Sequence, residues 1–270
     1  MALYFTMRNN LIDKKIIVTG ASSGIGERIV WHIASNGGIP ILLARSIDKL
    51  ESQQQLLKQT LNAESYVYQV DLQKHAELEA IFKLILIEHE QIHGLVNNAG
   101  AGIFDYIKDI AWKDVDHMFQ LNVFALIRGT KMILPHFLAQ KEGHIVNIAS
   151  QAGKISTPKS AVYASTKHAV LGFTNTLRLE IAAKKIHVTA VNLGPVRTNF
   201  FKGADPSGTY QKSVERYMLD PDVVAHKIVG HLFTKKREVN LPGWMEFGSK
   251  MYQLFPSVME RLLRRQFNKK

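Results

Sequence analysis

Short apolar runs alternate with longer amphipathic segments over the first two-thirds of the chain, and this alternation restricts the fold more than any other feature. A short apolar run predicts a buried strand, and the segments between runs predict helices. The predicted strands cover residues 15–19, 39–44, 65–70, 93–97, 144–149 and 187–192, with a last edge strand at Glu238–Leu241. A helix between two strands carries the chain back across the sheet, so neighbouring strands run parallel. We therefore predict an α/β fold, a doubly wound parallel sheet with helices on both faces.

The chain is long enough to form one domain of ordinary size. It has 270 residues, of which 46% are apolar, so a full core can be buried. No repeat, linker or change of composition marks a boundary, and we predict a single domain over residues 1–270. Within it, residues 200–220 predict a substrate loop and residues 244–270 an amphipathic C-terminal extension. Pro135 is expected to kink or end a long helix over residues 112–139.

Composition and charge exclude several classes of protein. The absence of cysteine excludes a disulfide scaffold, an iron–sulfur cluster and a thiol nucleophile. The formal charge of +11 favours anionic ligands, but no zinc finger or aromatic RNA-binding pattern appears, so we expect no nucleic-acid partner. The start MALYFTMRNN lacks the pattern of a secretory signal, and no uncharged apolar run reaches the ~18 residues of a membrane span. We therefore expect a cytoplasmic protein.

Residues 89–93 match the zinc-binding pattern H-E-x-x-H, which requires both histidines on one continuous helix. Here the helix must end before Gly94, where the fourth strand begins. The two histidines then cannot face one ion together, so we expect no metal site.

A glycine-rich loop over Thr19–Gly26 follows the first strand and opens the first helix. A helix N-terminus presents unpaired N–H groups and a partial positive charge, so it can hold a pyrophosphate. The order strand, loop and helix is that of a Rossmann dinucleotide site. The glycine spacing departs from the common G-x-G-x-x-G, and a glycine-rich turn without a ligand is the alternative.

Arg45 directly follows the second predicted strand, where the adenine ribose of a dinucleotide should lie. A carboxylate at that point bonds a 2′-hydroxyl, whereas an arginine accommodates a 2′-phosphate. Ser22 and Ser23 can add hydroxyl donors. This arrangement favours NADP over NAD, the alternative being that Arg45 is a solvated strand end.

Tyr163 and Lys167 lie four residues apart, so they share one face of a predicted helix. A nearby ammonium stabilises a phenolate, so we expect Lys167 to lower the pKa of Tyr163 and make it an acid–base group. Ser150 ends the strand before this helix, where ligands of doubly wound sheets bind, and can polarise a carbonyl there. A solvated surface pair is the usual alternative for an isolated Y-x-x-x-K.

These motifs together resemble the classical short-chain dehydrogenase/reductase family. The resemblance covers about residues 15–200 in the family's order. It is carried by the Thr19–Gly26 loop, Asp71-Leu72, Asn97-Asn98-Ala99-Gly100, Asn122, Ser150, Tyr163 with Lys167, and the Asn192–Thr198 segment. The family commonly has Pro-Gly where this chain has Leu193-Gly194.

The resemblance implies an NADP(H)-dependent oxidoreductase that interconverts a ketone or aldehyde and an alcohol. Tyr163 would be the general acid, Lys167 would tune it and hold the nicotinamide ribose, Ser150 would polarise the carbonyl, and Asn122 would anchor a relay water. The residues expected at the cofactor are Gly20, Ser22, Ser23, Gly24, Ile25, Gly26, Arg45, Asp71, Leu72, Asn98, Ala99, Gly100, Tyr163, Lys167, Gly194, Val196 and Thr198. A non-catalytic NADP-binding or regulatory protein on the same fold is the alternative.

Partners other than a small carbonyl substrate are implied less directly. The resemblance implies a homo-oligomer, a dimer or tetramer paired through the helices at residues 112–139 and 161–184. Apolar residues recur at helical spacing in residues 244–270, together with Arg261, Arg264, Arg265, Lys269 and Lys270. This extension either packs on its own domain or a second subunit, or covers an apolar substrate or contacts lipid. Met and aromatic residues over 200–255 form a lid or fill the core.

Overall fold

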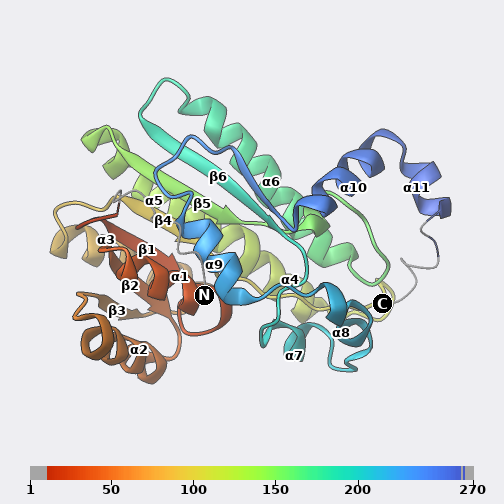
Figure 1. The fold of residues 1–270 in the computed structure, drawn as a ribbon, viewed down its shortest axis with the longest axis horizontal. Coiled ribbons are helices and arrows are strands. Elements are labelled where there is room, and N and C mark those ends of the chain that lie inside the picture. Colours follow the sequence, from red (N-terminus) through yellow and green to blue (C-terminus); the bar gives the residue numbers. More distant parts are fainter. Residues whose placement is uncertain (1–10, 263, 265–270) are drawn as a thin grey trace, which may run out of the picture.

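The computed structural model describes residues 11–262 and 264, and within them the chain forms one seven-stranded sheet (Figure 1). All strands pair in parallel, in the order β3-β2-β1-β4-β5-β6-β7. The strands are β1 (Lys15–Thr19), β2 (Ile39–Ala44), β3 (Tyr66–Gln69), β4 (Gly94–Asn97), β5 (Gly143–Ile148), β6 (Ile186–Leu193) and β7 (Glu238–Leu241). The predicted α/β fold with a Rossmann-type parallel sheet is confirmed, including the last edge strand.

Helices connect the strands. They are α1 (Gly24–Ser35), α2 (Ile47–Leu61), α3 (His75–Glu88), α4 (Trp112–Phe119), α5 (Ala125–Gln140), α6 (Ala161–Glu180), α7 (Phe200–Ala204), α8 (Thr209–Val214), α9 (Pro221–Val229), α10 (Gly243–Leu254) and α11 (Pro256–Leu262). In this described part of the chain, no helix is both long and apolar enough to cross a bilayer.

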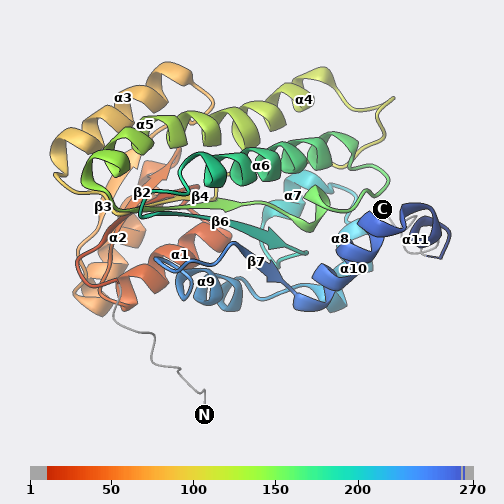
Figure 2. The same ribbon diagram turned by 90° about the horizontal axis from the view of Figure 1, so that it is seen from above.

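Two layers of helices cover the sheet (Figure 2). α1, α2 and α9 lie on one face, and α3, α4, α5 and α6 on the other. The helices on the sheet bury apolar side chains at helical spacing, such as Ile29, Val30 and Ile33 of α1. The central strands are apolar along both faces because both are covered, and β2 and β4 are buried at nearly every position.

The long helix predicted over residues 112–139 is divided into α4 and α5 by a π-helical turn at Gln120–Phe124. Pro135 lies inside α5 and does not end it. Its ring faces solvent, where water can satisfy the carbonyl that loses its helical partner. The expected break therefore lies upstream of the proline, at the turn that contains Asn122.

The H-E-x-x-H segment does not form a metal site. α3 ends at Glu88 and β4 begins at Gly94, so both histidines lie in the connecting loop and not on one continuous helix. His89 contacts the Tyr68 hydroxyl at 2.9 Å, and Nδ1 of His93 accepts a hydrogen bond from the backbone N–H of Lys15 at 3.1 Å. Among the residues described, no three His, Asp or Glu side chains are grouped to hold a metal ion.

The carboxyl ends of the strands position the site. The chain leaves β1 and β4 toward opposite edges of the sheet, because β1 is followed by β2 on one side while β4 is followed by β5 on the other. A crevice opens where the direction of winding reverses, and ligands of such sheets bind there.

Candidate active site

The loop between β1 and α1 is shaped by its glycines. Gly20 has φ +65° and Gly24 has φ +60°, a region that favours glycine. A side chain at Gly26 would collide with the carbonyl oxygen of Gly20. Asn98 holds the loop from outside, because its Nδ2 donates to the carbonyls of Thr19 at 3.0 Å and Gly20 at 3.2 Å. The loop is thus fixed against the end of β4.

A groove of about 340 Å³ lies along this loop and the N-terminus of α1. Twelve of the predicted cofactor residues line it, namely Gly20, Ser22, Ser23, Gly24, Ile25, Arg45, Asp71, Leu72, Asn98, Ala99, Gly100 and Thr198. An open helix N-terminus suits phosphate, and the exposed Arg45 guanidinium stands at the end of β2. The residues present therefore fit a dinucleotide.

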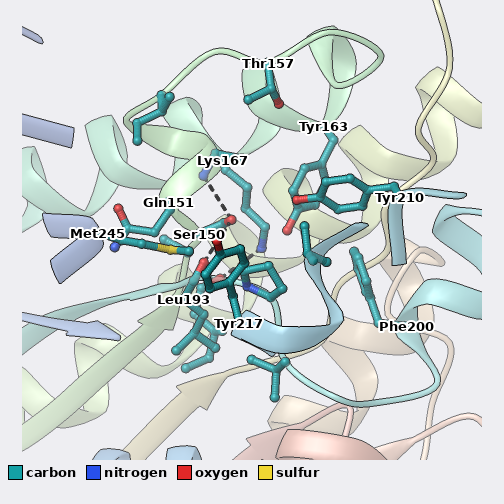
Figure 3. A pocket seen from close by; sticks show the side chains of 18 of the residues that line it. Ser150, Gln151, Thr157, Tyr163, Lys167, Leu193, Phe200, Tyr210, Tyr217 and Met245 are labelled. Atoms are coloured by element: carbon teal, nitrogen blue, oxygen red, sulfur yellow. Dashed lines mark hydrogen bonds between the residues drawn. The ribbon is translucent and has the colours of Figure 1, made fainter. Parts of the chain in front are cut away.

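A second cavity, of about 380 Å³, adjoins the groove and shares Asn98, Gly100 and Thr198 with it. Its walls are largely apolar and aromatic, and Figure 3 shows several of them around the catalytic candidates. Of the remaining predicted residues, Ser150, Tyr163, Lys167, Gly194 and Val196 line this cavity. Gly26 and Asn122 line neither space.

Ser150, Tyr163 and Lys167 converge at the floor of the cavity (Figure 3). Ser150 follows β5, and its Oγ accepts from the N–H of Ala152 at 3.1 Å, donates to the carbonyl of Leu193 at 3.3 Å, and is hydrogen-bonded to Tyr163. Lys167 lies one turn beyond Tyr163 on α6, with Nζ 5.8 Å from the centre of the tyrosine ring. The three side chains can therefore act on one substrate atom.

Burial controls the protonation of this group. It raises the pKa of Tyr163 to about 12, with the nearby Tyr210 adding to the rise, while the hydrogen bond with Ser150 opposes it. Burial also lowers the pKa of Lys167 to about 8. The expectation that Lys167 lowers the pKa of Tyr163 is wrong for this structure, because loss of hydration of the phenolate outweighs other influences. Near neutral pH Tyr163 is a phenol that can donate its proton.

Lys167 is held from the sheet side. Its Nζ donates to the carbonyl of Ile148 at 3.0 Å, and the side chain is only 5% exposed. One partner leaves two of its N–H groups free to point toward the cavity or the groove. Gly100 lies beside it, since a Cβ placed there would be 3.7 Å from Nζ. The absence of a side chain at Gly100 keeps the ammonium accessible from the groove.

Asn122 lies behind the site, in the π-helical turn. Its Oδ1 accepts from the N–H of Ala101 at 2.8 Å, and its Nδ2 donates to the carbonyl of Ala101 at 2.8 Å and to Oγ1 of Thr166 at 3.0 Å. Both amide hydrogens are therefore engaged. The side chain ties the segment after β4 to the helix of Tyr163, and its predicted contact with a relay water stays a prediction.

Aromatic rings from distant parts of the chain cover the cavity. Phe104 meets the rings of Tyr163 and Tyr210 edge-on, with centroids 5.6 and 5.3 Å apart, and Phe200 meets Tyr163 at 5.9 Å. Of the Met and aromatic residues noted over 200–255, Phe200, Phe201, Tyr210, Tyr217, Trp244, Met245 and Tyr252 line the cavity, and their role as a lid stays a prediction. Sequence reasoning missed Phe104, because nothing in the local pattern distinguishes it from a core residue.

Lys154 forms a second feature that the sequence did not predict. Its ammonium lies between carboxylates of Glu238 on β7, at 2.6 Å, and Glu246 on α10, at 2.8 Å. The side chain is 10% exposed and follows the turn that contains Ser150. This ion triad fastens α10, which carries Trp244 and Met245 over the cavity, to the loop of the catalytic serine.

Comparison with known proteins agrees with this geometry. A sequence model of the family described as short chain dehydrogenase matches residues 14–207. An uncharacterized oxidoreductase of Staphylococcus saprophyticus is 34% identical over 225 residues, which are 82% of this chain and 90% of the relative. Among solved structures, a short-chain dehydrogenase from Sphingobium yanoikuyae in complex with NADPH is 25% identical, with a TM-score of 0.78 over 90% of this chain and 95% of the other.

A second solved structure shares the fold. A short chain dehydrogenase/reductase from Burkholderia phymatum in complex with NAD has a TM-score of 0.82 at 22% identity, and the match covers 92% of this chain and 95% of the other. The two neighbours thus bind different nicotinamide dinucleotides. On the match to the family model and the identity to its relatives, the chain belongs to the short-chain dehydrogenase/reductase family of oxidoreductases.

Proposed function

We propose that this oxidoreductase interconverts a ketone or aldehyde and the corresponding alcohol, with NADP(H) as its cofactor. The observation that carries the proposal is the convergence of Ser150, Tyr163 and Lys167 at the floor of an apolar cavity that adjoins a dinucleotide-shaped groove. A binding protein needs the groove alone. Tyr163 can donate a proton, and the Ser150 hydroxyl and Lys167 ammonium lie beside it at a second cavity. This arrangement favours a reaction on a substrate that binds next to the dinucleotide.

A bound nicotinamide supplies or accepts the hydride. In reduction, the hydroxyl of Tyr163 donates its proton to the carbonyl oxygen as that oxygen gains charge. The raised pKa of Tyr163 keeps this proton available. Ser150 donates a hydrogen bond to the same oxygen, and the ammonium of Lys167 offsets the negative charge left on the phenolate. In oxidation, each proton moves in the opposite direction.

The preference for NADP rests on Arg45. Its guanidinium can form paired, charge-assisted hydrogen bonds to a 2′-phosphate, and no carboxylate follows β2 directly to receive a 2′-hydroxyl. The Sphingobium structure contains NADPH, which supports the preference for NADP. The Burkholderia structure contains NAD, so proteins with this fold bind either dinucleotide.

The lining of the cavity indicates the substrate class. Phe104, Phe200 and Trp244 supply apolar surface. Ser150 and Tyr163 supply hydrogen-bonding groups beside Lys167 (Figure 3). A pocket of this kind binds a molecule with one carbonyl on an otherwise apolar body. We therefore propose an apolar ketone or aldehyde as substrate.

The direct test is oxidation of NADPH across a series of carbonyl compounds, with NADH in parallel. We expect apolar ketones or aldehydes to be reduced, and NADPH to be preferred. Arg45→Glu should lower the affinity for NADPH by about tenfold or more, because a charge-assisted pair becomes a repulsive one. Lys49→Glu is the matched control, since it makes the same change of charge on an exposed residue outside the groove. A wild-type preference for NADH would refute the role of Arg45, and no turnover of any carbonyl would refute the proposed reaction.

We also propose that the protein is a homo-oligomer that pairs through the helical face opposite α1 and α9. Trp112 of α4 is 75% exposed there and Phe124, just before α5, is 42% exposed, so an apolar surface is available to a second copy. Light scattering should give a mass above 30.5 kDa, and a monomer at micromolar concentration would reject the pairing.

A further inference from the structure

Large apolar side chains are exposed along α10 and α11, which together form one end of the molecule (Figures 1 and 2). The exposed fractions are 60% for Trp244, 71% for Phe247, 69% for Leu254, 53% for Phe255, 56% for Val258 and 70% for Leu262. We call these six residues the C-terminal apolar face. Trp244, Phe247 and Leu254 are spaced by three and seven residues on α10, Val258 and Leu262 by four on α11, and Phe255 lies between the two helices, so the residues form stripes at helical spacing. Exposed apolar side chains this concentrated mark an interaction surface.

The inner side of the same two helices covers the substrate cavity. Met245, Tyr252 and Met259 line the cavity, while Phe247 and Leu254 do not. The helix pair is therefore apolar on two sides, one toward the cavity and one toward the outside. Trp244 belongs to both, since it lines the cavity and is 60% exposed. The outward face therefore adjoins the wall of the cavity.

Charge indicates what binds this face. Residues 244–270 contain six Lys or Arg against two Glu, a net charge of +4 within a chain of net charge +11. Lys250, Arg261 and Arg264 are exposed on or beside the two helices. A second copy docked about a twofold axis here would bring this positive charge against itself. An anionic surface is complementary to it.

We propose that the C-terminal apolar face docks on an anionic lipid surface, with its apolar side chains among the acyl chains and its cations at the headgroups. Docking in this orientation brings the wall of the cavity to the bilayer, so that apolar substrates enter from lipid. The docking is independent of the reaction, whereas the delivery of substrate rests on the proposed function.

Co-sedimentation of the full chain with vesicles tests the docking without substrate or cofactor. We expect the wild type to pellet with phosphatidylcholine vesicles that contain phosphatidylglycerol, and to pellet less with phosphatidylcholine alone or at high salt. The variant Phe247→Ser/Leu254→Ser should bind at least about tenfold more weakly, because it removes two apolar side chains from the interface. Leu56→Ser/Ile87→Ser is the matched control, since these residues are 50% and 80% exposed on α2 and α3, outside this face and outside the helices proposed to pair subunits.

The proposal is overturned if the wild type stays in the supernatant with every vesicle, or if the Phe247/Leu254 variant pellets like the wild type. The proposal is also overturned if the wild type forms dimers without vesicles and only the Phe247/Leu254 variant fails to form them. That result would show that a second copy of the chain covers this face. With a water-soluble carbonyl the variant should reduce substrate at the wild-type rate, whereas with a ketone dissolved in vesicles it should be slower. Equal rates of the two proteins on the ketone dissolved in vesicles would refute delivery of substrate from lipid. If neither protein reduces any carbonyl, the proposed reaction is refuted, but the result for vesicle binding still stands.

Discussion

Replacing Lys154 by Met should loosen the cover of the substrate cavity. Methionine keeps the apolar stem but removes the ammonium that lies between the carboxylates of Glu238 and Glu246, so among the described residues only the exposed Lys250 still pairs with Glu246. The Glu238 and Glu246 side chains are 22% and 18% exposed. Burial raises the pKa of Glu238, and hydrogen bonding and charge from Lys154 more than offset this and hold the pKa below its usual value.

The expected cost follows from this geometry. Breaking a buried ion pair costs about 3–5 kcal/mol, and we take about 3 kcal/mol because both carboxylates keep some contact with water. For a chain of this size, this lowers Tm by about 6–12 °C. The cost should shrink as the pH falls, because the pKa of Glu238 is held low by Lys154, and protonation of Glu238 in the variant removes the repulsion that the missing ammonium leaves.

Urea and thermal unfolding of Lys154→Met measure the cost, with Lys250→Met as the matched control. Lys250 pairs with the same Glu246 at 3.3 Å but is 68% exposed, so its loss should cost less than about 1 kcal/mol. In Lys154→Met the KM for an apolar carbonyl should rise more than kcat falls, because the cover is displaced and the catalytic groups stay. Equal stability of the two variants would refute the argument that Lys154 fastens α10.

Further predictions concern the glycine loop and a buried histidine. Gly26→Ala should abolish detectable NADPH binding, because its Cβ would collide with the Gly20 carbonyl. Gly172→Ala is the control: it has open space around it, so it should bind NADPH normally and be about 1 kcal/mol more stable than the wild type. NADPH titration and urea unfolding measure both effects, and two variants that behave alike would show the reasoning wrong. His144 is fully buried with Nε2 2.9 Å from Oγ1 of Thr189, and burial lowers its pKa to about 3. The unfolded chain protonates this histidine near pH 6.5 and the folded chain does not, so stability is lost as the pH falls below 6.5. Between pH 6 and 4 the free energy of unfolding should therefore fall more steeply for the wild type than for His144→Gln, by about 1.4 kcal/mol per pH unit. Equal slopes for the two proteins would contradict this.

The sequence predicted the parts of the fold that local pattern determines. Ile16, Ile17 and Val18 form an apolar run because β1 is buried between two helical layers, and such runs are visible without coordinates. Gly20 and Gly26 were visible because a tight approach of backbone to backbone leaves no choice of residue. The same holds for the spacing of Tyr163 and Lys167 on one helix.

Features that depend on long-range contacts were not predicted. Lys154 and Glu246 lie 92 positions apart, and nothing near either residue indicates the other. The pKa of Tyr163 was predicted in the wrong direction, because the four-residue spacing shows the ammonium but not the burial that opposes ionisation. The sequence also did not decide what the apolar stripe of residues 244–270 contacts, because such a stripe does not show whether the rest of the domain covers it. Phe267, Arg265, Lys269 and Lys270 lie outside the described residues.

The central claim is that Tyr163 transfers the proton beside a bound dinucleotide, and Tyr163→Phe tests it most directly. The change removes one oxygen and keeps the ring that packs on Phe104 and Phe200. NADPH affinity should stay at the wild-type value while turnover of the best carbonyl substrate falls about 10²–10⁴-fold. Turnover equal to that of the wild type, with NADPH bound normally, would contradict the account.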